Sequence, residues 1–127
     1  RLEGNALGRF LELVNEKKYA SKAYSALWTE KGVRIVERNF RNRHGEIDII
    51  GYHEGYLVFF EVKYRSTGRS GLPEAAVGFY KQKQICQVAA FYRCIHKISW
   101  NTPIRYDVIA MEGTQIRWYR NAFEHLG

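Results

Sequence analysis

The sequence has few of the residues that build a disulfide scaffold, a membrane anchor or a flexible linker. It contains two prolines and two cysteines, Cys86 and Cys94. If both cysteines lie on one helix, eight positions of helical rise separate them by about 12 Å, which exceeds the reach of a disulfide. The longest apolar run, residues 56–60, is far shorter than the roughly 20 residues that span a bilayer. We therefore expect free thiols and no membrane-spanning segment.

Positive charge exceeds negative charge along most of the chain. The 127 residues include 20 Lys and Arg against 13 Asp and Glu, which gives a net charge of +7. Residues 31–127 hold fifteen of these cations and nine of the anions, so the excess belongs to the body of the chain. Hydrophobic residues make up 46% and charged residues 26%, as in a globular domain. A basic domain of this kind favours an anionic partner, either nucleic acid or a membrane surface.

Hydrophobic periodicity predicts an α/β fold with the element order α-β-β-β-α-β-β. Apolar residues at helical spacing predict a first helix over residues 5–31, which Gly32 ends. A second helix is predicted to start at Pro73 and Glu74, which suit a first helical turn, and to run to about Lys97. Strands are predicted over residues 33–40, 46–50, 56–64, 104–110 and 115–119. Together they form a mixed sheet flanked by helices, with an antiparallel first hairpin.

The predicted strand 46–50 carries two carboxylates among isoleucines. Strand alternation places Glu46 and Asp48 on one face, and Ile47 and Ile49 on the other. Aspartate is disfavoured in strands, and charged side chains are rarely buried without a partner. A carboxylate at this place is therefore a candidate functional group.

The predicted strand 56–64 ends its apolar run with Glu61, and Lys63 follows on the same face. Taken alone, these two side chains are explained by a surface ion pair where the strand leaves the sheet. If this strand pairs with the preceding one, Asp48 and Glu61 project toward one point. Converging carboxylates repel each other unless a divalent cation joins them, and the Val62 carbonyl and water would complete an oxygen shell for Mg²⁺ or Mn²⁺. Lys63 would then orient the attacking water or stabilise charge on phosphorus.

Basic residues flank this hairpin. The run at 37–44 interleaves arginines with an aromatic residue, and its arginines are placed to contact phosphates beside the metal site. Two lysines of the second helix are further candidates, although a solvated helix face explains them equally well. The predicted nucleic-acid contacts are Arg38, Arg41, Arg43, Arg65, Lys81 and Lys83.

Several stretches of the sequence resemble the bacterial UPF0102 (YraN-like) family, in order and at matching spacing. They are RNFR at 38–41, GEIDII at 45–50, LVFFEVKYR at 57–65, GLPEAAV at 71–77, RYDVI at 105–109 and NAF at 121–123. The resemblance covers residues 32–123. It implies a PD-(D/E)xK, restriction-endonuclease-like fold that is related in shape to Holliday-junction resolvases. It also implies a single nuclease-like domain over residues 1–127, of which residues 1–31 are an N-terminal helical segment.

The resemblance implies that Asp48, Glu61 and Lys63 occupy the nuclease motif positions. Glu46, which shares a predicted strand face with Asp48, and Ser21 are candidate accessory residues. Family members place a glutamate in the first helix at the position that is Ser21 here. A neutral hydroxyl at this place would weaken metal binding, because metal affinity depends on the number of charged ligands.

The leading hypothesis is therefore a Mg²⁺- or Mn²⁺-dependent, endonuclease-like hydrolase that acts on DNA in the cytoplasm, as a monomer or a homodimer. One alternative is a module of the same fold that binds nucleic acid but cuts poorly, which Ser21 favours. A second alternative is a nuclease effector or toxin domain of a larger secreted protein, because the chain starts with Arg1 and its first helix departs from the family pattern. That alternative implies an inhibitor or immunity protein as a partner.

Overall fold

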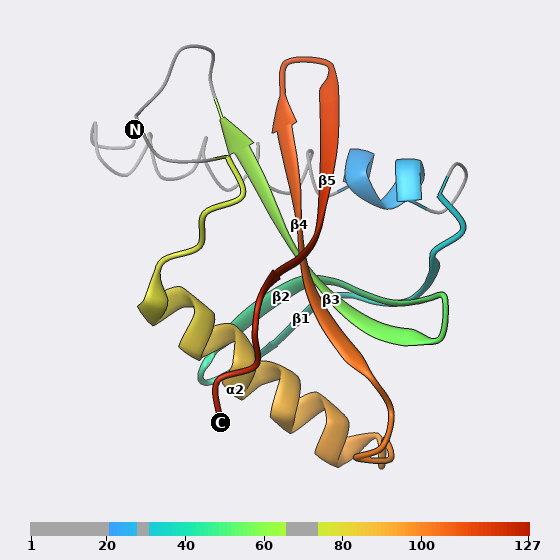
Figure 1. Cartoon of the computed structure of the whole chain (residues 1–127), viewed down its shortest axis with the longest axis vertical. Coiled ribbons are helices and arrows are strands. Elements are labelled where there is room, and N and C mark those ends of the chain that lie inside the picture. The colour runs from blue at the N-terminus through green and yellow to red at the C-terminus, as the bar shows by residue number, and fades with distance from the viewer. Residues whose placement is uncertain (1–20, 28–30, 66–73) are drawn as a thin grey trace, which may run out of the picture.

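The computed structural model describes residues 21–27, 31–65 and 74–127 (Figure 1). Of the helix predicted over residues 5–31, the part 21–27 is helical, and residues 5–20 and 28–30 lie outside the described residues. The later elements are β1 (Arg34–Asn42), β2 (Gly45–His53), β3 (Tyr56–Arg65), α2 (Phe79–Ile95), β4 (Ile104–Glu112) and β5 (Gln115–Phe123). The predicted α/β class and the order of elements are confirmed.

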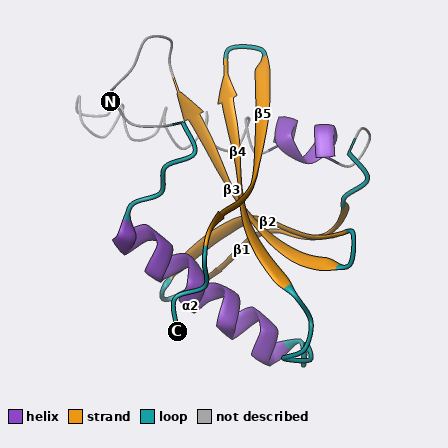
Figure 2. Cartoon of the chain, viewed as in Figure 1, coloured by secondary structure: helices purple, strands orange, loops and turns teal. Residues whose placement is uncertain are grey.

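The five strands form one mixed sheet in the order β1-β2-β3-β4-β5. β3 and β4 run parallel, and the other neighbours are antiparallel. The predicted pairing of the two carboxylate strands is confirmed, since β2 lies beside β3. A parallel pair needs a crossover connection, and α2 lies within the segment that joins β3 to β4 (Figure 2).

Alternate residues of β3 fill two separate cores, one on each face of the sheet. Leu57 and Phe59 pack in a cluster with residues of α2, whereas Val58 and Phe60 pack in a second cluster with Ala23 of the helical residues 21–27. All four strand side chains are at most 1% exposed. Burial of a large apolar side chain stabilises a fold by about 1.5–3 kcal/mol. β3 is thus held firmly from both sides up to the residue that precedes Glu61.

The regular alternation predicted for β2 is wrong around Asp48. Ile47 packs in the cluster with α2 and Ile49 in the opposite cluster, although residues two apart in a regular strand share a face. On β1, Phe40 is the cross-strand partner of Ile47 and also packs against the α2 cluster. Asn39 lies between the regular cross-strand pairs Arg38–Ile49 and Phe40–Ile47. Its φ of 53° is in the left-handed region that asparagine tolerates. Both strands of the hairpin therefore change faces at the same place.

α2 begins at Phe79, later than predicted. Glu74 forms a turn, and its carboxylate is 2.6 Å from the guanidinium of Arg117 on β5. This tertiary ion pair competes with the helical conformation that the sequence favours locally, while Pro73 lies outside the described residues. α2 ends at Ile95, and each strand extends beyond its predicted end by one to four residues.

Both cysteines lie on α2 as free thiols, with Cys86 buried and Cys94 exposed. Within the ranges that the structure describes, no helix is long and apolar enough to cross a bilayer.

Candidate functional site

Asp48 and Glu61 meet at the point where β2 and β3 separate. The regular pairs of this ladder end at Ile49 and Phe60. Beyond that pair, Asp48 Oδ2 accepts a hydrogen bond of 2.7 Å from the backbone N–H of Val62. The Glu61 carboxyl group lies close enough to Asp48 for its charge and its side-chain contact both to raise the pKa of Asp48. The structure thus brings the two carboxyl groups together.

The environment of the pair favours the protonated form of Asp48. Burial, followed by the charge of Glu61, raises the pKa of Asp48 from its ordinary 3.8 to about 8, and the Val62 N–H opposes this rise only in part. Glu61 has a second contact on its other side, since its Oε2 is 3.1 Å from Nζ of Lys81 on α2. The Glu61 side chain is 13% exposed, so this ion pair is shielded from water on the carboxylate side.

β3 presents Glu61 and Lys63 on the face that α2 covers, because Val62 between them packs against the opposite core. Lys63 Nζ donates a hydrogen bond to the carbonyl of Ala76, in the segment that leads into α2. The same segment is held by the ion pair between Glu74 and β5. The three predicted site residues Asp48, Glu61 and Lys63 therefore lie beside the start of α2.

Two of the predicted cationic contacts are engaged with other residues of the protein. The Arg38 guanidinium is 4.5 Å from the ring centre of Tyr24, which packs in the core on the face opposite α2. Arg41 is paired with Glu46 on the neighbouring strand at 2.8 Å, with both side chains partly in solvent. Ser21 is exposed at the first described position of the helical residues 21–27.

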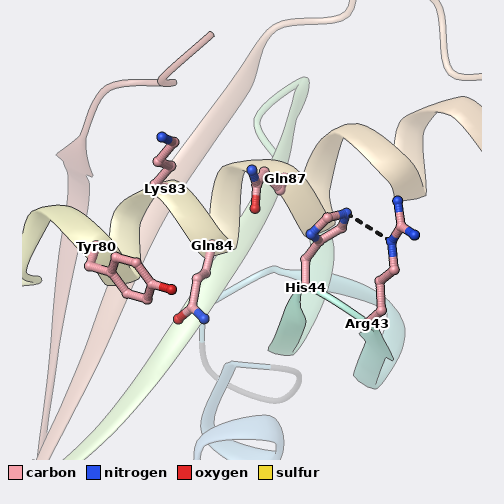
Figure 3. A pocket seen from close by; sticks show the side chains of 6 residues that line it. All are labelled: Arg43, His44, Tyr80, Lys83, Gln84 and Gln87. Carbon is pink, nitrogen blue, oxygen red and sulfur yellow. Dashed lines mark hydrogen bonds between the residues drawn. The ribbon is translucent and has the colours of Figure 1, made fainter.

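Of the remaining predicted cations, Lys81 lies near the start of α2, where it contacts Glu61. Arg43 and Lys83 line a pocket of about 290 Å³ between the β1–β2 turn and α2 (Figure 3). Arg65 ends β3, and its side chain is outside the described part of the chain. The other residues that line the pocket are His44, Tyr80, Gln84 and Gln87. Tyr80, Gln84 and Gln87 were not predicted from the sequence, although their spacing of four and three positions is typical of one polar stripe of a helix.

Asp107 is a further carboxylate on an apolar strand, and the structure gives it a structural role. It is 0% exposed and receives hydrogen bonds from the Arg105 guanidinium, the Trp118 indole at 2.8 Å and the Asn121 backbone N–H at 2.9 Å. Arg105 also donates to Nδ1 of His53 at 3.1 Å, and burial lowers the pKa of His53, so this nitrogen accepts. The cluster is internally satisfied, as buried polar groups generally are.

The donor set at the carboxyl pair fits a hard divalent cation. Among the described residues, no group of three or more His, Cys, Asp and Glu side chains is placed to hold a metal ion. Asp48 and Glu61 nevertheless bring carboxyl oxygens from two adjacent strands close together, where a cation would relieve the repulsion that raises the pKa of Asp48. In a strand the N–H and the carbonyl of one residue point to the same side, so we expect the carbonyl of Val62 to face Asp48 as its N–H does. Oxygen ligands of this kind, with water, are those that Mg²⁺ and Mn²⁺ prefer.

Comparison with known proteins gives a consistent family match. The model of "Uncharacterised protein family UPF0102" matches residues 8–111. The UPF0102 protein of Lachnoclostridium phytofermentans is 43% identical over 99 residues, which cover 78% of this chain and 84% of that protein. The UPF0102 protein of Colwellia psychrerythraea is 38% identical over 114 residues, with 85% and 88% covered. That of Marinobacter nauticus is 40% identical over 99 residues, with 74% and 80% covered.

Proposed function

The chain belongs to the UPF0102 family, and from its paired carboxyl groups we propose that it is a metal-dependent hydrolase that cleaves phosphodiester bonds in nucleic acid, with DNA as the first substrate to test. The observation that carries this proposal is the approach of Asp48 to Glu61: the two carboxyl groups come from adjacent strands, and Glu61 raises the pKa of Asp48. Lys63 follows on the same strand face, so the chain presents two carboxylates and a lysine in the order of a PD-(D/E)xK site.

Each residue of the site has a role in this proposal. Asp48, Glu61 and the carbonyl of Val62 would hold Mg²⁺ or Mn²⁺. The ion, when bound, would supply a positive centre that polarises a phosphoryl oxygen and lowers the pKa of water. Lys63 provides positive charge for the negative charge that develops on the phosphate as water attacks phosphorus and the bond to the leaving oxygen breaks. Lys81 stays 3.1 Å from Glu61 and helps an anionic substrate to approach.

The charge of the surrounding surface supports a nucleic-acid substrate. The chain carries a net charge of +7; Lys81 contacts Glu61, and Arg43 and Lys83 line the pocket between the β1–β2 turn and the same helix. Contacts from such side chains to phosphate supply most of the affinity of nucleic-acid binding and make it sensitive to salt.

A cleavage assay with end-labelled substrates tests the proposal directly. Single-stranded, duplex and branched DNA and matching RNAs are incubated with Mg²⁺ or Mn²⁺ and the wild-type protein, Asp48→Asn or Glu61→Gln. We expect cleavage that needs the metal and falls about 100-fold or more in both variants, since loss of one electrostatic group at a reacting centre has effects of that size. Glu124→Gln, which alters an exposed carboxylate outside the site, is the matched control. Cleavage that persists in Asp48→Asn would refute the site.

A nucleic-acid-binding module that does not cut is the second candidate. Two observations favour it: in the described ranges only Asp48 and Glu61 converge at the site, and Lys81 already balances the charge of Glu61. In the same assay this candidate predicts retention of the labelled substrate by the protein with no metal-dependent product on any of the tested forms.

A further inference from the structure

The pocket between the β1–β2 turn and α2 is built from residues of two kinds. One side is the helical stripe Tyr80, Lys83, Gln84 and Gln87, and the other is Arg43 and His44 of the turn (Figure 3). The β1–β2 turn approaches α2 closely at Gly45. An added Cβ at this glycine would lie 3.7 Å from Val88 and 3.8 Å from Gln84, and its φ of 153° disfavours other residues.

The pocket combines three chemical features. Arg43 and Lys83 are cations, and no carboxylate is among the described residues that line it. Tyr80 leaves 75% of its surface exposed at one side of the space. The amides of Gln84 and Gln87 each offer donors and an acceptor. At Arg43, Nε lies 3.5 Å from Nε2 of His44, so the guanidinium remains close to the turn.

We propose that this pocket binds one unpaired nucleotide of a nucleic-acid strand. The Tyr80 ring stacks on the base, Gln84 and Gln87 contact its polar edge, and Arg43 and Lys83 bind the adjacent phosphates. Aromatic rings that stack on successive bases beside cations are the usual means of binding single strands, because every base has a flat apolar face. The volume of about 290 Å³ lies near the lower end of small-molecule pockets, about 300–1,000 Å³, and suits one nucleotide unit.

This inference rests on the proposed action on nucleic acid and adds the form of the substrate. A duplex keeps its bases stacked inside the helix, so it offers Tyr80 only a backbone. The substrate class is therefore a strand with at least one unpaired base, such as a single-stranded end, a flap or a branch. Lys81, which contacts Glu61, directly follows Tyr80 on α2, so the pocket and the carboxyl pair lie at neighbouring residues of one helix.

The test compares two fluorescent oligonucleotides with the same number of phosphates, an oligothymidylate and the same strand with an abasic residue at every position. Binding is measured by anisotropy in EDTA, so that no cleavage intervenes. The wild type should bind the oligothymidylate about 5- to 100-fold more tightly than the abasic strand, the range expected for stacking of one base. Tyr80→Ala should remove this preference and Tyr80→Phe should keep it. Lys83→Gln should weaken binding of both strands by the same factor.

Trp100→Ala is the control, because Trp100 is 67% exposed but lies outside the pocket. Circular dichroism of each variant verifies that it is folded. Equal binding of both strands by the wild type, or a preference that survives in Tyr80→Ala, would overturn the pocket assignment while the proposed hydrolase remains intact. Failure of the wild type to bind any DNA or RNA would overturn the proposed function together with it.

Discussion

Replacing Asp48 with asparagine should make the protein more stable at alkaline pH. The pKa of Asp48 is about 8 in the folded protein and near its ordinary 3.8 in the unfolded chain. Between these two values the folded protein binds more protons, so the free energy of unfolding falls as the pH rises. The stability that this group contributes is fully present below about pH 4 and is lost as the pH passes 8.

The size of this difference in the free energy of unfolding follows from the pKa shift of Asp48. One pKa unit corresponds to about 1.4 kcal/mol, and water screens part of the interaction because the burial of Asp48 is incomplete. If half of the shift from 3.8 to about 8 is effective, the ionised pair costs the fold roughly 3 kcal/mol above pH 8. Asparagine removes the charge and keeps an oxygen to accept the Val62 N–H. We therefore expect Asp48→Asn to unfold with a free energy roughly 3 kcal/mol higher than wild type above pH 8, and nearly equal at pH 4.

Urea unfolding followed by circular dichroism, at several pH values between about 4 and 9, measures this difference in a metal-free buffer. The control is again Glu124→Gln, which removes one exposed carboxylate and should follow the wild-type pH dependence. If Asp48→Asn and the wild type show parallel curves of stability against pH, the pKa of Asp48 is not raised in the folded protein and the reasoning about the site is wrong.

Three further predictions concern other parts of the molecule. Asp107→Ala should lower the free energy of unfolding in urea by about 3–5 kcal/mol, because it leaves Arg105 buried without its ion-pair partner; a loss below about 1 kcal/mol would contradict the structural role. Lys83→Gln should reduce the slope of log binding constant against log salt for an oligothymidylate by about 0.7, whereas Arg120→Gln on β5 should leave it unchanged; equal effects of the two substitutions would show that binding uses no defined cationic surface. Ser21→Glu should tighten Mn²⁺ binding in calorimetry if the first helix lies beside the carboxyl pair, and an unchanged Kd would show that the family-based position of this residue is wrong.

The central part of the fold can be predicted from the sequence because its signals are local. The unbroken apolar run before Glu61 marks a strand covered on both faces, and the turn residues Glu54 and Gly55 mark its pairing with the strand that carries Asp48. Once these two strands are neighbours, the meeting of the two carboxylates follows from their positions. This is why the candidate site could be named before the structure.

The features that the sequence does not reveal depend on contacts between distant residues. The late start of α2 reflects an ion pair between Glu74 and Arg117, which are 43 positions apart. The pocket needs the β1–β2 turn and α2 to lie together, and Gly45 in the turn gives no sign of which helix will approach it. The contact between Lys81 and Glu61 depends in the same way on how α2 crosses the sheet.

The shared change of faces at Asn39 and Asp48 restricts how the β1–β2 hairpin can pair. An ordinary antiparallel hairpin that slips by two residues keeps every side chain on its original face, because alternation repeats every second residue. In this hairpin such a slip would move the change of faces on one strand away from that on the other. Phe40 and Ile47, which now pack together in the α2 core, would then be separated. Misregistered pairings are thus penalised during folding, and Asp48 reaches Glu61 in one register.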